Sequence, residues 1–261
     1  MSEDVLFRLR VRYVETGRLR YLSHLELLRA LERTMRRAGL PYAVTQGFSP
    51  RIKAAYCPAL PVGVASLDEW FDVWLREYRP AEEYLALLQG AAVDDLMPCE
   101  ASFVDVRSPS LSAALTLASW TLDVAARADG EGGRIAIDAS SLQGACDAVG
   151  AAGEIRYLRN GKPRTVSLEG KFARVPAVRE VDGADAVRIE MVTRASNEGA
   201  LRPDVFLDAV IAQLAETSRA AGGPVSAAAD DAVSCRQLVR ADIVRTAQYL
   251  EGEDGSWVRP I

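Results

Sequence analysis

A cluster of arginines is the first feature of this sequence that could do chemistry. The arginines follow one another at three- and four-residue spacings through 29–37, and such spacings put side chains on one side of a helix. Because a guanidinium group can bind a phosphate through two parallel hydrogen bonds, the cluster predicts a surface that holds RNA by its phosphates. The arginines assigned to this surface are Arg20, Arg29, Arg33, Arg36, Arg37 and Arg51. The alternative is a solvated helix face on which Glu26 and Glu32 pair with Arg29 and Arg36.

The segment Gln46-Gly47-Phe48-Ser49-Pro50-Arg51 is typical of a turn, with unusual content. Gly47 tolerates a positive φ and Pro50 fixes its own φ, so the backbone is strongly restrained. Phe48 either stacks on a base or fills the core beneath the turn, and the sequence leaves both readings open. Gln46, Phe48 and Arg51 therefore belong to the candidate RNA-binding residues.

His24 is the only histidine of the chain and the one candidate for a catalytic residue. It would serve as the general base of a metal-free endoribonuclease, the alternative being a structural, hydrogen-bonded histidine. No metal site is expected, because the four cysteines lie 42, 47 and 89 residues apart, too far for a local zinc or iron–sulfur motif. We expect these cysteines to be free thiols in a reducing compartment. No cofactor is expected either: there is no P-loop, and Gly130-Glu131-Gly132-Gly133 is typical of a hairpin turn.

The elements that would position these residues follow the order β-α-β-β-α-β. Ser23-His24-Leu25-Glu26 is a capping box, and it predicts a helix that buries Leu28, Leu31, Met35 and Ala38 and ends at Gly39. The other predicted elements are strands or extended segments at 5–14, 42–46, 51–57, 68–77 and 97–106, and a short helix at 80–88.

The second half of the chain repeats this order. Its predicted elements are strands at 117–125, 187–193 and 237–244, helices at 140–149 and 202–217, and a hairpin of 154–158 with 164–168 around Asn160-Gly161. The expected fold class is α+β, with two ferredoxin-like units in tandem. A basic N-terminal unit would occupy 1–110, and a second unit with the inserted hairpin would occupy 111–261.

The charge of the chain is distributed unevenly. The net charge is −5, yet residues 1–60 hold eleven Lys and Arg against five Asp and Glu, and residues 61–155 hold five against sixteen. A basic N-terminal part is typical of a polyanion-binding surface, and the alternative is ordinary surface variation. The acidic run of Asp68, Glu69 and Asp72 is expected to face solvent or to guard a sheet edge.

The composition is that of a globular protein. Apolar residues make up 49% of the chain, and no stretch approaches the ~20 apolar residues of a membrane helix. The start of the sequence is acidic and lacks the apolar segment of a secretory signal. We therefore expect a soluble, cytoplasmic protein without a membrane partner.

Four strings carry a resemblance to a known family: G-R-L-R-Y-L-S-H-L-E, R-A-L-E-R-T-M-R-R-A-G-L-P, T-Q-G-F-S-P-R and L-P-V-G-V-A-S. They are similar to the DUF2344 family, also called radical SAM-linked proteins, most strongly over residues 5–75. The resemblance implies a radical S-adenosylmethionine protein as partner. Because the C-x₃-C-x₂-C cluster loop of such an enzyme is absent, this chain would be the partner of the catalyst.

The function expected on these grounds is that of a non-catalytic RNA-binding or substrate-presenting partner of a radical S-adenosylmethionine enzyme in tRNA or rRNA modification. The RNA part depends on the basic region and on analogy with other paired ferredoxin-like RNA-binding proteins, and a fold alone does not fix a function. Two alternatives remain open: the endoribonuclease that uses His24, and a protein–protein adaptor whose acidic 61–155 region docks a basic partner.

Overall fold

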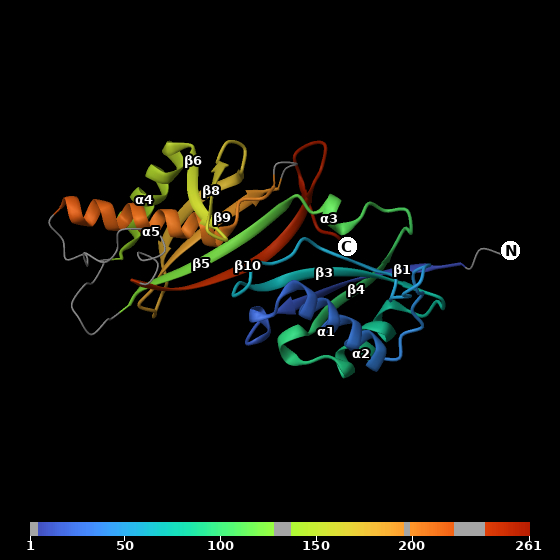
Figure 1. Ribbon diagram of the computed structural model, residues 1–261. Coiled ribbons are helices and arrows are strands. Elements are labelled where there is room, and N and C mark those ends of the chain that lie inside the picture. The colour runs from blue at the N-terminus through green and yellow to red at the C-terminus, as the bar shows by residue number, and fades with distance from the viewer. Residues whose placement is uncertain (1–4, 128–136, 196–198, 222–237) are drawn as a thin grey trace. The chain divides into compact units, whose positions relative to one another are not determined.

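The computed structural model describes residues 5–127, 137–195, 199–221 and 238–261 (Figure 1). The fold is mixed α+β and divides into two compact units. Unit 1 comprises Met1–Thr116 and Arg245–Ile261, and unit 2 comprises Leu117–Val244. The sequence pattern assigned everything after residue 110 to one unit. The last strand differs from that assignment, because it gives its first residues to unit 2 and its remaining residues to unit 1.

Unit 1 begins with the order β-α-β-β-α-β. Its elements are β1 (Phe7–Glu15), η1 (Leu19–Tyr21), α1 (His24–Arg37), β2 (Ala54–Tyr56), β3 (Ala65–Leu75), α2 (Ala81–Ala91), η2 (Asp94–Leu96), β4 (Pro98–Val104), α3 (Leu111–Ala114), the end of β10 (Val239–Glu251) and β11 (Trp257–Val258). β1 lies between β4 and β3 and is antiparallel to both, and β2 is antiparallel to β3. The strand order is therefore β4-β1-β3-β2.

Helices α1 and α2 cover one face of these strands (Figure 1). Alternate residues of β1, such as Leu9 and Val11, face the helices and are fully buried, as a period of two requires. α1 begins after Ser23, where the predicted capping box is present, and the chain leaves it through Gly39 at φ 66°. Both predicted ends of this helix are confirmed. The buried face of the helix differs from the predicted one by one residue. Leu27 is buried, whereas Leu28, which was predicted to be buried, is only half-buried.

The opposite face of unit 1 is also buried, and it is charged. Arg8 and Arg10 of β1 both donate to the carboxylate of Asp72 on β3, with shortest N···O distances of 2.6 and 2.8 Å. Arg8 also donates to the carbonyl of Pro109, and Arg10 donates to that of Pro260. The side chains of these arginines are at most 5% exposed, and that of Asp72 is fully buried. These two arginines therefore add nothing to the basic surface that the charge count suggested.

Asp68 and Glu69 are likewise buried, so the expectation that the acidic run faces solvent is wrong. Asp68 accepts hydrogen bonds from the backbone N–H of Gln248 and from both terminal nitrogens of Arg259. Beside them Trp70 packs with Leu111, Leu115 and Cys57 and, at the edge, with Leu250 and Ile261. The segment after β4 and residues 245–261 thus cover this face. A sequence scan cannot see them as partners, because they lie far away along the chain.

Unit 2 has the same succession of elements with one addition. It contains β5 (Leu117–Ala126), α4 (Ala139–Ala152), β6 (Glu154–Arg159), β7 (Lys162–Ser167), β8 (Phe172–Glu180), β9 (Val187–Arg194), α5 (Pro203–Ala220) and the first residues of β10. The strand order is β10-β5-β9-β8, and α4 and α5 lie on one side of it (Figure 1). β6 and β7 form a separate two-stranded hairpin, as Asn160-Gly161 predicted.

Two strands differ from the sequence-based expectation. β8 was not predicted, because Pro176 interrupts its pattern. It is an edge strand, where proline is tolerated. β10 was predicted to end at residue 244, but it continues to Glu251 because its last residues pair within unit 1. The predicted turn at 130–133 lies outside the described residues.

Other general expectations concern thiols and membranes. Cys57, Cys99 and Cys146 are free thiols, as expected, and Cys235 lies outside the described residues. Among the described helices, none combines the length and the apolar character needed to cross a membrane.

Candidate functional site

A groove of about 480 Å³ lies on the surface of unit 1, between α1 on one side and η1, the end of α2 and η2 on the other. Its apolar lining consists of Leu19, Leu22, Ala30, Ala91, Val93 and Leu96. Its polar lining consists of Glu26, Arg29, Arg33, Thr34 and Arg37. The groove therefore brings together three of the six arginines that the sequence marked as RNA-binding.

Arg29, Arg33 and Arg37 form a row along the groove. They are four residues apart, so each step advances about 6 Å along the helix axis. Within the part of the chain that the structure describes, neither Arg33 nor Arg37 has an ion-pair or hydrogen-bond partner for its guanidinium group. The row therefore presents unneutralised positive charge beside an apolar floor.

Glu26 is the one carboxylate of the groove lining, and it is part of the capping box at the start of α1. Its Oε2 accepts hydrogen bonds from the backbone N–H of Ser23 at 2.9 Å and from the Ser23 hydroxyl at 2.7 Å. These bonds lower the pKa of Glu26, and the charge of Arg29 adds a smaller effect in the same direction. Arg29 is thus partly offset by Glu26, whereas Arg33 and Arg37 are not.

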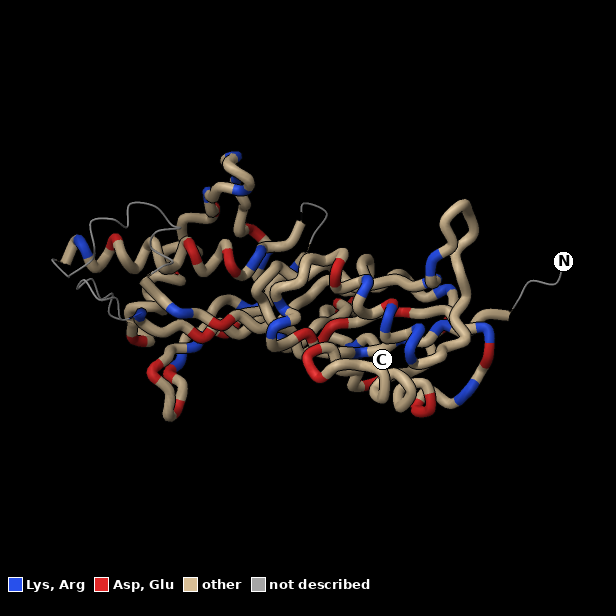
Figure 2. The backbone as a smooth tube through the Cα atoms, turned by 60° about the horizontal axis from the view of Figure 1, so that its bottom comes forward, with Lys and Arg blue, Asp and Glu red and all other residues tan. Residues whose placement is uncertain are grey.

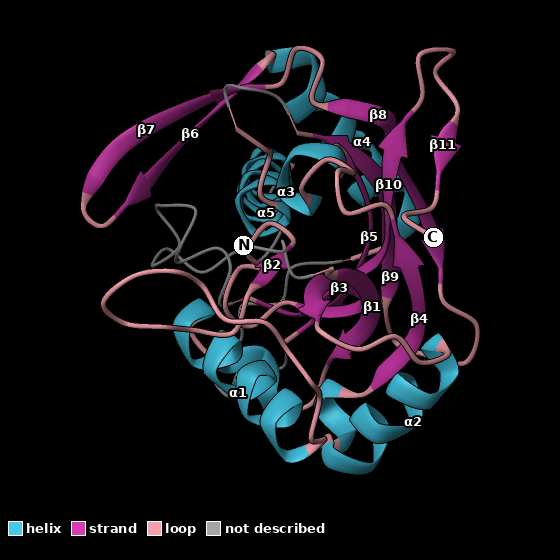
Figure 3. Ribbon diagram, turned by 90° about the vertical axis from the view of Figure 1, so that its right-hand side faces the viewer, coloured by secondary structure: helices cyan, strands magenta, loops and turns pink. Residues whose placement is uncertain are grey.

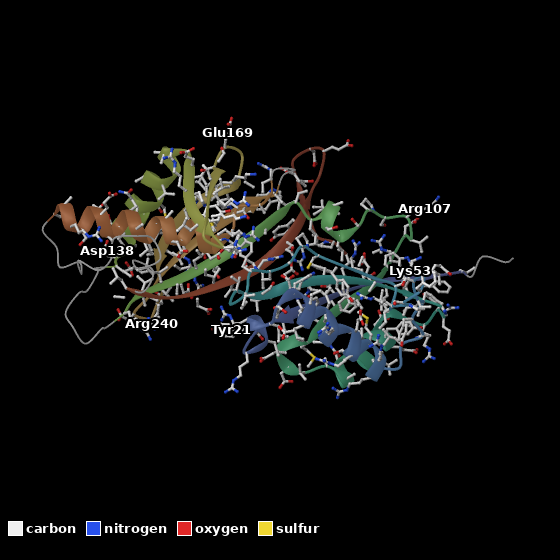
Figure 4. All side chains as sticks on the ribbon, in the orientation of Figure 1. Tyr21, Lys53, Arg107, Asp138, Glu169 and Arg240 are labelled. Atoms are coloured by element: carbon white, nitrogen blue, oxygen red, sulfur yellow. The ribbon has the colours of Figure 1, made fainter. Side chains whose placement is uncertain are left out.

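The other two arginines near α1 have different surroundings. Arg36 does not line the groove, and its Nη2 lies 3.1 Å from Glu32, one helical turn back. For Arg36 the structure therefore contains the alternative arrangement, a solvated i,i+4 ion pair on the helix surface. Arg20 donates from Nε to the carbonyl of Gly63 at 2.8 Å and so also braces a loop. Next to it Tyr21, labelled in Figure 4, has an exposed side chain.

The residues of the turn at 46–51 are exposed. Thr45 and Arg51 close it, since Thr45 N–H donates to the Arg51 carbonyl at 2.9 Å and Arg51 N–H donates to the Thr45 hydroxyl at 3.1 Å. Gly47 has φ 132°, as its turn role required. The side chain of Phe48 is fully exposed, so it does not fill the core. Gln46 and Arg51 are also exposed.

His24 is the first residue of α1, and it is exposed. Within the described residues its ring has no hydrogen-bond or ion-pair partner. A catalytic base is normally oriented by a further polar group, so nothing in its surroundings marks it for catalysis. Among the described residues, no three His, Cys, Asp or Glu side chains are grouped closely enough to hold a metal ion.

A second polar cluster is buried inside unit 1, and no pattern in the sequence indicated it. Glu15 of β1 and Glu69 of β3 share the charge of Arg245, whose Nη1 lies 3.3 Å from Glu69 Oε1. The thiol of Cys57 donates to Glu69 Oε2 at 2.8 Å, and burial is the main cause that raises the pKa of this thiol. Burial, followed by the charge of Glu69, raises the pKa of Glu15 to about 8. The cluster is therefore a proton-binding part of the core.

Comparison with known proteins identifies a family that this chain matches. Residues 8–203 match the family described as "Uncharacterized protein conserved in bacteria (DUF2344)". None of the curated proteins matches the chain. The matched segment runs from β1 to the first residue of α5, and so it includes the groove, the turn at 46–51 and the β6–β7 hairpin. Because this match spans well over half of the sequence, the chain belongs to the DUF2344 family.

Proposed function

We propose that this protein is a cytoplasmic, non-catalytic RNA-binding or substrate-presenting partner of a radical S-adenosylmethionine enzyme that modifies tRNA or rRNA. The observation that carries the RNA part is the row of Arg29, Arg33 and Arg37 along the groove of α1. The radical S-adenosylmethionine partner is supported by the family resemblance of the strings at 17–26 and 45–51.

The row suits a polyanion with regularly repeated charges. Its ~6 Å steps place guanidinium groups along a line, as the consecutive phosphates of one RNA strand require. The apolar lining offers a surface against which an unstacked base can pack, which is how proteins commonly hold single-stranded RNA. The exposed ring of Phe48 is a further stacking surface on the same unit.

We also propose that each unit is ferredoxin-like. The support is the strand order: β4-β1-β3-β2 in unit 1 and β10-β5-β9-β8 in unit 2, each following the succession β-α-β-β-α-β. The hairpin β6–β7 would then be an insertion between the first helix and second strand of unit 2.

The RNA part is tested by measuring the binding of a labelled tRNA at several salt concentrations. Replacing Arg29, Arg33 and Arg37 together by Gln should lower the slope of log affinity against log salt by up to about three, one for each lost phosphate contact. Arg36→Gln is the matched control, because Arg36 lies on the same helix but is paired with Glu32. An unchanged slope in the triple variant refutes the proposal.

The same experiment separates the non-catalytic function from the nuclease alternative. The tRNA should be recovered at full length, because a binder does not cleave it. Cleavage that disappears in His24→Ala would favour the endoribonuclease. The partner is tested by co-expression with a radical S-adenosylmethionine enzyme of the same host, and failure of the two proteins to co-purify, with or without RNA, counts against that part.

A further inference from the structure

The β6–β7 hairpin of unit 2 stands apart from the other strands of its unit (Figure 3). Its two strands are joined by a two-residue turn in which Asn160 has φ 52° and Gly161 has φ 70°. Positive φ at both central residues is the geometry that matches the twist of a tight hairpin, so the end of the hairpin is well defined. The base of the hairpin is anchored by Ile155, which is buried.

Three of the four cationic residues of the hairpin lie on one face. Tyr157 lies opposite Arg164, and Arg159 lies opposite Lys162. Since directly opposed residues share a face and alternate residues of a strand do so too, these four side chains form one surface near the end of the hairpin. Figure 2 shows Lys and Arg positions along this hairpin.

The opposite face has a different character. It carries Leu158 opposite Pro163, both exposed, and Arg156 opposite Thr165. Arg156 is paired with Glu154, at 2.7 Å. The one acidic residue of the hairpin is therefore already used, and it serves the other face.

Repulsion between the charges of the cationic face destabilises the hairpin of the isolated protein. Arg159 and Lys162 are like charges placed directly opposite each other, an arrangement that destabilises a strand pair. Among the described residues, neither of them nor Arg164 has an acidic partner, and all three are exposed. A bound anion would relieve this repulsion.

We propose that the face formed by Tyr157, Arg159, Lys162 and Arg164 binds the phosphate backbone of RNA and is a second RNA contact of the protein. This inference rests on the proposed function, since it takes RNA as the ligand. An RNA backbone fits better than an acidic protein, because protein interfaces have apolar centres depleted of charge, whereas nucleic-acid interfaces are polar and strongly positive. The exposed apolar residues of this hairpin, Leu158 and Pro163, lie on the other face.

A contact of this kind positions RNA without reading its sequence. Replacing Arg159, Lys162 and Arg164 together by Gln should therefore lower the salt slope of tRNA binding by up to about three and weaken binding to unrelated structured RNAs equally. Arg156→Gln, on the opposite face, is the matched control and should leave the slope unchanged. Because removal of like charges relieves repulsion, the triple variant should keep the thermal unfolding midpoint of the wild type.

The outcomes separate this inference from the proposed function. If the hairpin variant and the groove variant each lower the slope, both stand. If only the groove variant does, the hairpin inference is refuted and the proposed function remains. If the wild type binds no RNA, both fall. Binding of poly-glutamate that is lost in the hairpin variant, with tRNA binding intact, would identify an acidic protein as the ligand and would also refute the inference. The single variants Arg159→Gln and Lys162→Gln, each expected to lower the slope by about one, give the same decision should the triple variant fail to fold.

Discussion

At the scale of single residues, the most consequential group outside the proposed RNA-binding surfaces is Glu15. Glu15 is 2% exposed and its carboxylate interacts with that of Glu69, so two carboxylates share the single positive charge of Arg245. Because burial and Glu69 raise the pKa of Glu15 to about 8, the folded protein holds a proton here at neutral pH that the unfolded chain releases.

Glu15→Gln should therefore change how stability depends on pH. The folded pKa lies above the unfolded one, so the contribution of Glu15 to stability is fully present below pH ~4.5 and falls by at most about 1.4 kcal/mol per pH unit as the pH rises toward 8. Glutamine is neutral at every pH and removes this loss. Urea unfolding of both proteins at pH 5, 6.5 and 8 measures the effect. The variant should gain on the wild type as the pH rises, and parallel profiles would show that Glu15 is ionised in the fold.

The burial of individual charged side chains could not be predicted from the sequence. The strand at 5–14 was correctly predicted, but the charge count included Arg8 and Arg10 in the basic N-terminal part. Their partner Asp72 lies more than sixty residues away, and Pro260 lies 250 residues away. An alternating apolar and charged pattern is the same whether the charges meet water or one another, so pairing across the chain is invisible in the pattern. The exposure of Phe48 was undecidable for a related reason, because the turn chemistry fixes its backbone but not its surroundings.

At the scale of elements, the turn between β1 and η1 sets one wall of the groove. Gly17 has φ 51°, and a side chain there would overlap the carboxylate of Asp95 in η2. That carboxylate accepts a hydrogen bond from the backbone N–H of Arg18 at 3.1 Å. The contact joins η1 to η2, the two short helices that flank the groove opposite α1.

Gly17→Ala should cost about 2–3 kcal/mol, because it combines a left-handed backbone with displacement of Asp95. Gly39→Ala is the matched control: its φ is 66° but nothing lies within 4 Å of the new Cβ, so only the backbone term of about 1–2 kcal/mol applies. Chemical denaturation of the two variants measures the difference between their free energies of unfolding. Equal losses of unfolding free energy in the two variants would mean that Asp95 moves aside without an energetic penalty. A larger loss in Gly17→Ala, with weaker tRNA binding, would tie the turn to the groove.

Elements with a local signal were predicted well. The capping box at Ser23 and the glycine at 39 fixed both ends of α1, and Asn160-Gly161 placed the hairpin. β8 was missed because a proline masks its pattern, and β10 was cut short because the reason for its extension lies in unit 1. The three arginines of the groove were all named from sequence. Their separation from Arg36 was not, since it depends on which side of α1 faces the groove.

At the scale of the whole molecule, unit 1 is made from two distant parts of the chain. Residues 245–261 supply Arg245, Gln248 and Arg259 to the buried acids of β3. Without them Asp68 and Glu69 would lose their ion pairs with Arg259 and Arg245, and breaking one such buried pair typically costs about 3–5 kcal/mol. That loss is comparable to the whole stability of a small domain.

A chain ending at Val244 should therefore lose the fold of unit 1 and keep that of unit 2, whose residues it retains entirely. Hydrogen exchange measured by mass spectrometry tests this directly. Amides of β1 and β3 should exchange rapidly in the truncated chain, whereas those of β9 and α5 stay protected. Arg259→Gln, which removes a single partner of Asp68, should give a partial effect. Persistent protection of β1 and β3 after truncation would contradict the dependence of unit 1 on these residues.

The divided composition of unit 1 has a consequence for synthesis on the ribosome. The strands and helices that form the arginine groove are translated first, yet the segment that completes them is translated last, after all of unit 2. At elongation rates of ~5–20 residues per second this delay is on the order of 10 s. The nascent chain must therefore hold unit 1 unfinished while unit 2 folds. If unit 1 needs residues 245–261 to fold, as the truncation is expected to show, chains that terminate before them lack a folded groove and should not bind the proposed RNA ligand.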